Sequence, residues 1–341
     1  MNLQTTLLNK SKYSFIPDYN RMIDSTDRQI LYFLDRNSRQ SYSKIAKEID
    51  ISKASVGYRI NRMIENGIIK DFYTVINPFK LGFIPFRFYL RFQYADPSIE
   101  NQIINHFAHD HRAWWVASLN GKYNLAVNML IKNNHEFLDF WRTTLDKYRY
   151  YIQEEVFSIY FQLCARNYSY LYSSEETKDI QKYIINNEEK KTTLSENEVS
   201  LLKMVSNSAR TSGTEIADQL NITPSGVNYL FKQLEKKEII LGYRANLDIK
   251  KIGFEDFKLD IFLTDYQRRD EVISYLEQNP HLVLLSRSVG ISDIEAEFHF
   301  ENIEMLHVII NQLYERFPGI IRSCNYHHIV VQHKWNFVPL I

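Results

Sequence analysis

The stretch ISKASVGYRINRMIENGII, at residues 51–69, spaces hydrogen-bonding and cationic side chains along a predicted helix. Its apolar face is formed by Val56, Ile60 and Met63. Small, polar and cationic residues occupy the first turn, the flank and the opposite face: Lys53, Ala54, Ser55, Tyr58, Arg59 and Arg62. Small residues let a helix enter the major groove of DNA, where guanidinium and phenol groups can reach base edges and phosphates. The stretch therefore predicts a helix that contacts double-stranded DNA.

The elements that must position this helix can be read from the residues around it. Helices are predicted at about 27–36 and 43–49, and a three-residue turn leads to the third helix. The third helix ends at Asn66-Gly67, a sequence suited to the left-handed residue that commonly terminates a helix. An extended segment at 68–76 then fits a wing strand. This order is typical of a winged helix-turn-helix.

The chain repeats this plan 171 residues later. Residues 45–83 align without a gap with residues 216–254, and both copies end in Gly-Phe. A match of this length indicates an internal duplication. In the second copy, the third helix carries Ser225, Tyr229 and Lys232 as its candidate DNA contacts.

The rest of each copy reads as strand, helix, hairpin, helix and strand, with an Asn-Gly turn in the first hairpin. This βαββαβ order is ferredoxin-like. The predicted fold class is therefore α+β, with two copies of a winged helix-turn-helix followed by a ferredoxin-like βαββαβ domain. The predicted segments are an N-terminal extension (1–25), the first winged helix-turn-helix (26–84), the first βαββαβ domain (85–172), a partly helical linker (173–193), the second winged helix-turn-helix (194–255) and the second βαββαβ domain (256–341).

Charge distinguishes the two copies. Residues 27–84 contain ten cations and six anions, a net charge of +4, whereas residues 198–255 contain eight and seven, a net charge of +1. Where the first copy has Arg59 and Arg62, the second has Leu230 and Gln233. We therefore expect the first copy to be the main DNA reader and the second to be weaker. Surface cations also occur on ordinary solvated helices, and winged helices also bind proteins, so charge alone leaves both alternatives open.

Several residues at fixed spacing resemble the Lrp/AsnC family of regulators. They are Asp27, Ile30-Leu31, Arg39 with Ser41, Ile45-Ala46, Ser52, Val56, Arg59-Ile60, Arg62-Met63 and Gly67-Ile68-Ile69. The resemblance implies a transcription regulator that binds DNA, with Arg39 added to the DNA-binding residues. It also implies that βαββαβ domains pair and assemble further. Because alternating strands need a partner on their apolar face and tethering raises its effective concentration, we expect an intramolecular pseudo-dimer and a homo-oligomer.

The family's Gly-x-x-Asp hairpin has a counterpart in each copy, Gly121 to Asn124 and Gly290 to Asp293. The resemblance implies a small effector, such as an amino acid, near these hairpins. Its candidate contacts are Ser118, Gly121, Asn124, Ser288, Gly290 and Asp293. Because Asn124 replaces the acidic residue, we favour the second hairpin for an effector's ammonium group.

Some fused two-copy proteins that resemble this family are siroheme decarboxylases, so an enzyme is the alternative. The residues that could take that role are His109, His111, Arg112, Tyr123 and Arg287, but their spacing does not reproduce the decarboxylase pattern well. We therefore expect no enzyme activity, no catalytic residues and no cofactor.

Composition narrows the remaining classes. Lys plus Arg and Asp plus Glu are each 41, so the formal net charge is zero, which leaves room for a local basic surface. The two cysteines form no zinc-binding spacing. The histidines are expected on polar or solvent-exposed faces and not as metal ligands: His109, His111, His327, His328 and His333. No run of about 18 apolar residues occurs, which predicts a cytoplasmic protein without a membrane span.

Overall fold

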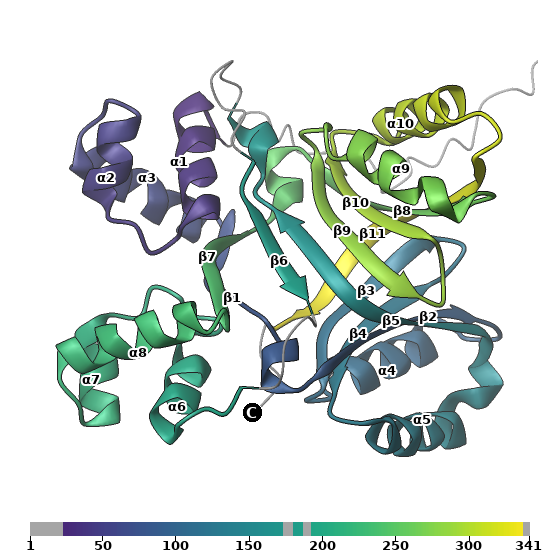
Figure 1. The fold of residues 1–341 in the computed structure, drawn as a ribbon, viewed down its shortest axis with the longest axis horizontal. Helices are drawn as coiled ribbons and strands as arrows, with labels where there is room; N and C mark the ends of the chain where they lie inside the picture. The colour runs from purple at the N-terminus through teal and green to yellow at the C-terminus, as the bar shows by residue number, and fades with distance from the viewer. Residues whose placement is uncertain (1–22, 173–179, 187–191, 337–341) are drawn as a thin grey trace, which may run out of the picture.

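The computed structural model describes residues 23–172, 180–186 and 192–336. Nearly all of the predicted N-terminal extension and most of the predicted linker lie outside these residues. Figure 1 shows the two winged helix-turn-helix domains on one side of the molecule and a β-barrel on the other. The fold class predicted from the sequence is confirmed.

The first winged helix-turn-helix contains α1 (Ser25–Arg36), α2 (Tyr42–Glu48), α3 (Lys53–Glu65) and the wing strand β1 (Ile69–Ile76). Each helix begins at a side chain that accepts a backbone N–H hydrogen bond, which satisfies one of the unpaired donors of the first turn. These N-cap residues are Asp24, Ser41 and Ser52. Val56, Ile60 and Met63 are fully buried, as the helical spacing predicts.

The second winged helix-turn-helix contains α6 (Glu196–Val205), α7 (Gly213–Leu220), α8 (Pro224–Lys236) and β7 (Ile240–Leu247). Its wing strand pairs antiparallel with β1 of the first copy and forms a two-stranded sheet. The two winged helix-turn-helix domains are therefore joined to each other through their wings (Figure 1).

Each βαββαβ domain has the ferredoxin-like strand order, β5-β2-β4-β3 in the first copy and β11-β8-β10-β9 in the second. The first copy contains β2 (Ile84–Phe92), α4 (Pro97–Ala108), β3 (Ala113–Gly121), β4 (Leu125–Ile131), α5 (Asn134–Tyr148) and β5 (Ile152–Arg166). The second contains β8 (Glu255–Leu263), α9 (Arg269–Leu276), β9 (Leu282–Val289), β10 (Ile294–Phe300), α10 (Ile303–Arg316) and β11 (Ile321–Trp335).

The two sheets join at both edges and close into a barrel. Strand β3 pairs with β11, β5 pairs with β9, and β2 pairs with both β4 and β5. The helices of the two copies cover opposite outer sides of the barrel (Figure 1). The face of each sheet that carries no helix therefore points into the barrel, toward the other copy.

One part of the predicted linker differs from the expectation of helix. Residues Lys182–Asn186 form strand β6, which pairs antiparallel with the second half of β5. Tyr183 and Ile185 are buried while their neighbours are more exposed, and this alternation has the period of a strand. The strand was not predicted because charged residues on both sides hide a short alternating segment. No helix in the described ranges is both long and apolar enough to cross a membrane.

Candidate functional site

Helix α3 presents an exposed outer face on the side opposite its buried stripe. Lys53, Ala54, Tyr58, Asn61 and Glu65 are all exposed. The Tyr58 side chain is the largest of them, with 68% of its surface exposed. Ser52 caps the helix by accepting the Ser55 N–H at 3.0 Å. The predicted contacts Lys53, Ala54 and Tyr58 therefore share one accessible surface.

The two arginines of α3 lie on another face and contact carboxylates of their own domain. Arg59 Nη1 lies 2.7 Å from Asp24 Oδ2 and 2.9 Å from Asp27 Oδ1. Arg62 Nη2 lies 2.5 Å from Asp27 Oδ2. Hydrogen bonds to Asp24 and Asp27 raise the pKa of Arg59. Both arginines are part of the packing between α3 and the start of α1.

Asp27 explains why these arginines face inward. Its side chain is fully buried, and its Oδ2 also accepts the Asp24 N–H at 3.1 Å as half of a capping box. A buried carboxylate is costly unless a cation and hydrogen bonds compensate it. On the helical wheel Arg59 and Arg62 share the flank that meets α1, so they supply this compensation. Arg59 and Arg62 were predicted as DNA contacts because local spacing does not reveal their contacts with carboxylates at the start of α1.

In the second copy, a different cation pairs with the carboxylate at the start of the first helix. Glu198, at the position of Asp27, forms the capping box of α6 with Ser195 and lies 2.6 Å from the Lys237 ammonium. Lys237 stands at the position of Asn66, so Leu230 and Gln233 need not carry charge. The absence of the two arginines from α8 therefore follows from the change of carboxylate partner. It says nothing about how well α8 contacts DNA.

The outer face of α8 is polar and cationic. The candidate contacts Ser225, Tyr229 and Lys232 are exposed, and so is Lys236. Tyr229 is 61% exposed and occupies the position that Tyr58 has in α3. Lys232 and Lys236 of α8 are accompanied by one exposed anion, Glu235, whereas on α3 one exposed lysine, Lys53, is accompanied by Glu65. The ranking of the two reading heads that whole-domain charge predicted is therefore not supported by their accessible faces.

Arg39 lies in the interface between the two winged helices and not beside α3. Its guanidinium donates to the carbonyl oxygen of Ala209 and stacks over the Phe231 ring at 4.4 Å. Its counterpart Arg210 stacks over Tyr42 at 4.7 Å. Burial lowers the pKa of Arg39. The matched arginines therefore hold the two domains together, and the prediction that Arg39 contacts DNA has no support from its position.

The two predicted effector hairpins use their acidic or amide side chain in the same way. Asn124 Oδ1 accepts the Phe92 N–H at 2.8 Å, and Asp293 Oδ2 accepts the Leu263 N–H at 2.7 Å. Phe92 and Leu263 are matching residues of the two copies. An amide and a carboxylate therefore accept the same backbone hydrogen bond. The presence of Asn124 in place of an acidic residue is thus explained without invoking an effector.

The remaining hairpin residues also have structural partners. Gly290 has a φ of 137°, and an added Cβ would lie 2.1 Å from the Phe157 carbonyl oxygen. Gly121 has a φ of 148°, and a Cβ added there would lie 2.8 Å from the Tyr326 carbonyl oxygen. Ser118 hydrogen-bonds to a histidine, His333, and Ser288 donates to Glu295 inside the barrel. Three of the six candidates belong to the first hairpin and three to the second, and Ile291 of the second hairpin packs in the same apolar cluster as Leu119 and Tyr123 of the first.

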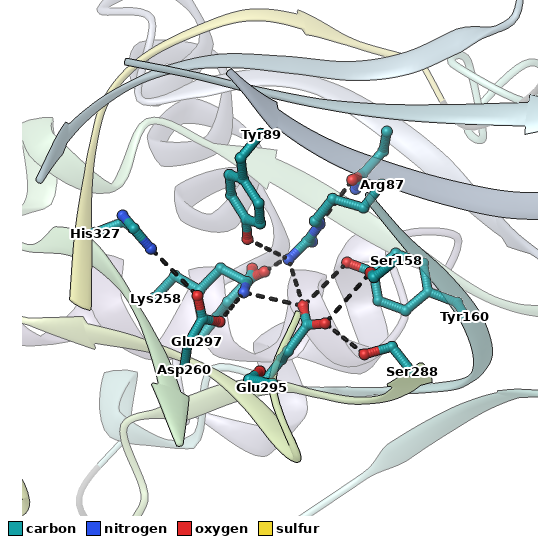
Figure 2. A network of polar contacts seen from close by, with 12 residues as sticks. Arg87, Tyr89, Ser158, Tyr160, Lys258, Asp260, Ser288, Glu295, Glu297 and His327 are labelled. Atoms are coloured by element: carbon teal, nitrogen blue, oxygen red, sulfur yellow. Dashed lines mark hydrogen bonds and ion pairs between the residues drawn. The ribbon is translucent and has the colours of Figure 1, made fainter. Parts of the chain in front are cut away.

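A buried polar network that the sequence did not predict fills the barrel (Figure 2). Arg87 of β2 lies 3.0 Å from Glu295 and 3.1 Å from Glu297 of β10, so these ion pairs join the two copies. Lys258 of β8 lies 2.9 Å from Glu295 and also contacts Asp260. Burial alone would raise the pKa of Glu295, but the charges of Lys258 and Arg87 lower it below its ordinary value.

His327 belongs to this network, which corrects the expectation of an exposed histidine. Its side chain is fully buried, and its Nε2 lies 3.2 Å from Asp260 Oδ2. The alternation of β11 was hard to follow because this strand bends where it leaves β8 and joins β3. Among the residues the structure describes, no group of three or more His, Cys, Asp or Glu residues could hold a metal ion.

A signal for this network was present in the sequence. Arg87 and Lys258 occupy matching positions 171 residues apart, each in the middle of a predicted strand. A cation at the same place in two alternating strands indicates an inward charge that needs partners. The partners of Arg87, Glu295 and Glu297, come from the opposite copy, and no local pattern could pair them with it. Lys258 contacts Glu295 on a neighbouring strand of its own copy.

The residues considered for a decarboxylase do not converge. Arg112 is held by Asp110, 2.6 Å away, and Tyr123 donates to Glu154. Arg287 lies 3.2 Å from the exposed Asp270. The other two, His109 and His111, lie in the turn before β3. Arg112 shares that turn, whereas Tyr123 and Arg287 lie on other elements, and none of the five lines the cavity between the barrel and the wing strands.

Known proteins resemble this chain at two levels. The family of winged helix-turn-helix DNA-binding domains matches residues 23–70 and 194–240. An uncharacterized HTH-type transcriptional regulator of Pyrococcus furiosus is 45% identical over 62 residues, which are 18% of this chain and 42% of the relative. The HTH-type transcriptional regulator LrpB of Bacillus subtilis is 43% identical over 61 residues, 18% of this chain and 41% of that protein. This chain thus spans less than half the length of these two relatives.

The solved structure of the siroheme decarboxylase NirDL is similar along almost the whole chain. The TM-score is 0.62 at 12% identity, and the match covers 93% of this chain and 94% of the other. At this identity the similarity concerns the fold. It shows that the overall fold of this chain, both copies included, is shared with another protein over nearly the full length of each.

Proposed function

We propose that this chain, a tandem Lrp/AsnC-like fusion, is a sequence-specific DNA-binding transcription regulator that reads DNA with both of its third helices. The observation that carries the proposal is the matched pair of exposed tyrosines, Tyr58 on α3 and Tyr229 on α8, each on an open polar face. Because the two tyrosines stand at matching positions, each third helix presents a phenol group at the same point of its outer face. Phosphates and base edges are suitable partners for their phenol groups.

The proposed contacts differ from those of the charge argument. Lys53, Ala54, Ser55 and Tyr58 act from α3, and Ser225, Tyr229 and Lys232 act from α8. Arg59 and Arg62 position α3 against α1 and contribute to the electrostatic field of the domain without leaving Asp27. The wing pairing of β1 with β7 fixes the two heads relative to each other, so the spacing of the two half-sites on DNA is set by the fold.

The proposal is tested with DNA selected from a random pool at one stated salt concentration, followed by fluorescence anisotropy with single variants. Tyr58→Ala and Tyr229→Ala should each weaken binding by about 5- to 30-fold, which corresponds to about 1–2 kcal/mol for a lost hydrogen bond and contact. Tyr266→Ala is the matched control, because Tyr266 is 64% exposed but lies on the barrel. Unchanged affinity in both recognition-helix variants would refute the proposal.

Lys232→Ala tests whether the second head takes part. We expect a weaker complex and a shallower dependence of log affinity on log salt concentration, because a lysine at a phosphate releases about one counterion. If Lys232→Ala binds as tightly as the unaltered chain at every salt concentration, the second head does not contact DNA.

The alternative function, decarboxylation of a siroheme-like substrate, is supported by fold similarity alone. A tetrapyrrole with several carboxylates needs free cations and a large pocket. The cavity at the end of the barrel holds about 100 Å³, and its two arginines are already paired with carboxylates. Absorbance in the Soret region after incubation with siroheme separates the alternatives, because a regulator should show no bound tetrapyrrole.

A further inference from the structure

A cavity of about 100 Å³ lies between the barrel and the paired wing strands β1 and β7. Its polar lining includes Arg87, Asp256 and Glu297 from the barrel and Arg244 from β7. Its walls are largely aromatic: Tyr73, Trp114, Trp115, Tyr168 and Trp335. The cavity is separate from both Gly-x-x-Asp hairpins, none of whose residues line it.

Two polar atoms of this lining have no hydrogen-bond partner among the described residues. They are Asp256 Oδ1 and the indole Nε1–H of Trp115. The two side chains are only 6% and 4% exposed, respectively. Buried polar groups are almost always hydrogen-bonded, so unpaired groups that line a cavity indicate a molecule that completes them. Such a molecule must offer a donor to Asp256 and an acceptor to Trp115.

The charge of the surroundings favours a cation. The barrel network contains two cations and three carboxylates: Arg87, Lys258, Asp260, Glu295 and Glu297. Its net charge from these groups is therefore −1, before Asp256 is counted. The other cation of the lining, Arg244, lies 2.6 Å from Asp35 and is neutralised there.

Asp256 responds to this excess of negative charge. Burial and the nearby Glu297 carboxylate raise the pKa of Asp256 well above its ordinary value, against the opposing charges of Lys250 and Arg87 and a hydrogen bond from Gln332. The surroundings of the free cavity therefore disfavour the ionised form of this carboxyl group. A cation bound beside Asp256 would favour its ionised form, and indole faces also attract cations.

We propose that this cavity binds a small protonated amine that also carries an oxygen acceptor. The ammonium group lies against Asp256 and Glu297, and the oxygen accepts the Trp115 N–H. The ammonium group stabilises the ionised Asp256 carboxylate, so binding is coupled to the release to solvent of the proton that this group carries when it is un-ionised. Because Tyr73 and Arg244 belong to the wing strands, the ligand touches the elements that carry the reading heads. A regulatory effect of the amine on DNA therefore rests on the proposed function, but its binding does not.

The four tryptophans provide the assay. Trp114, Trp115 and Trp335 line the cavity, whereas Trp141 packs between Phe88 and Phe157 in the helix-covered core and serves as an internal reference. Ethanolamine is titrated into 15N-labelled protein, with ethylene glycol and glycolate as neutral and anionic probes of similar size. We expect ethanolamine to shift the Trp115 indole signal with a midpoint in the millimolar range, about what four non-hydrogen atoms can reach.

Proton release gives the second readout. The ethanolamine affinity should rise about tenfold per pH unit as long as Asp256 is protonated in the free protein. Asp256→Asn should weaken binding at least tenfold and remove this pH dependence. Asp293→Asn is the control, because it reproduces the residue of the first hairpin at Asn124 and should leave the titration unchanged.

Three results would overturn the proposal: tighter binding of glycolate than of ethanolamine, an equal shift of the Trp141 signal, or no ethanolamine shift at any of the three cavity tryptophans. The outcome is independent of the DNA experiments. Loss of DNA binding in the Tyr58 and Tyr229 variants with no amine titration would leave the regulator standing and remove the cavity proposal. Ethanolamine binding without DNA binding would support the cavity proposal and remove the proposed regulator function.

Discussion

The double variant Arg59→Ala, Arg62→Ala separates a structural role of these arginines from a DNA-contacting one. It removes the cations that face Asp27, which is fully buried and lies 2.9 and 2.5 Å from the two guanidinium groups. Breaking a buried ion pair by removing one side costs about 3–5 kcal/mol. Because the Arg59 and Arg62 side chains are 23% and 37% exposed, solvent screening reduces this cost, and we expect about 2–4 kcal/mol.

The loss should be confined to the first winged helix-turn-helix. Hydrogen exchange of amides in α1 and α3 should accelerate by roughly 30- to 900-fold, which is the same free energy expressed as an opening constant. Exchange in α8 and in the barrel should change little. Adding Asp27→Asn to the double variant should restore most of the protection, because an amide can still accept the Asp24 N–H but carries no charge.

The second copy supplies a further control for this prediction. Asp27→Glu and Asn66→Lys, added to Arg59→Leu and Arg62→Gln, install the set found at Glu198, Lys237, Leu230 and Gln233. This exchange should also recover protection. Normal hydrogen exchange in the double alanine variant, together with lost DNA binding, would refute the reasoning and return the arginines to the DNA-contacting surface.

Two further predictions concern stability. Burial, followed by the charge of Arg244, lowers the pKa of His299 to about 3. As pH falls below about 6.5, His299 gains a proton in the unfolded chain but not in the native state. The free energy of unfolding should therefore be about 2 kcal/mol lower at pH 5 than at pH 8 because of His299. Urea unfolding at several pH values should show that the free energy of unfolding rises with pH, and that His299→Gln makes this rise smaller. An equal rise in the variant would contradict the prediction. Gly290→Ala should destabilise the chain markedly because the added Cβ meets a backbone oxygen at 2.1 Å, whereas Gly213→Ala, with nothing within 4 Å, should not. Equal melting temperatures for the two variants would refute the hairpin packing.

The order of elements could be predicted because it depends on local patterns. The buried stripe of α3, the caps and the alternation of the strands each follow from residues within a few positions of one another. The alignment of the internal repeat then predicted the same order of elements for the second copy. The strand β6 was missed because its alternating residues, 182–186, are too few to stand out between charged neighbours.

The roles of individual side chains were harder to predict, since they depend on contacts between distant segments. Arg59 and Arg62 were placed correctly on one helix, but the carboxylate that holds them belongs to α1. Arg39 contacts Ala209, 170 residues away, across an interface that no local pattern defines. Arg87 likewise finds Glu295 in the other copy, 208 residues away. Positions were therefore predictable where partners were not.

The barrel network shows what fusion makes available to a protein of this kind. At matching positions the first copy has Tyr89, Ala126 and Asn128 where the second has Asp260, Glu295 and Glu297. Two identical chains related by a twofold axis would have to bring the same residue to both sides and would place carboxylate near carboxylate. A single chain is free of that restriction and can divide acids and their counterparts between its halves. The same freedom extends to α3 and α8, so a preferred DNA target need not read the same on both strands.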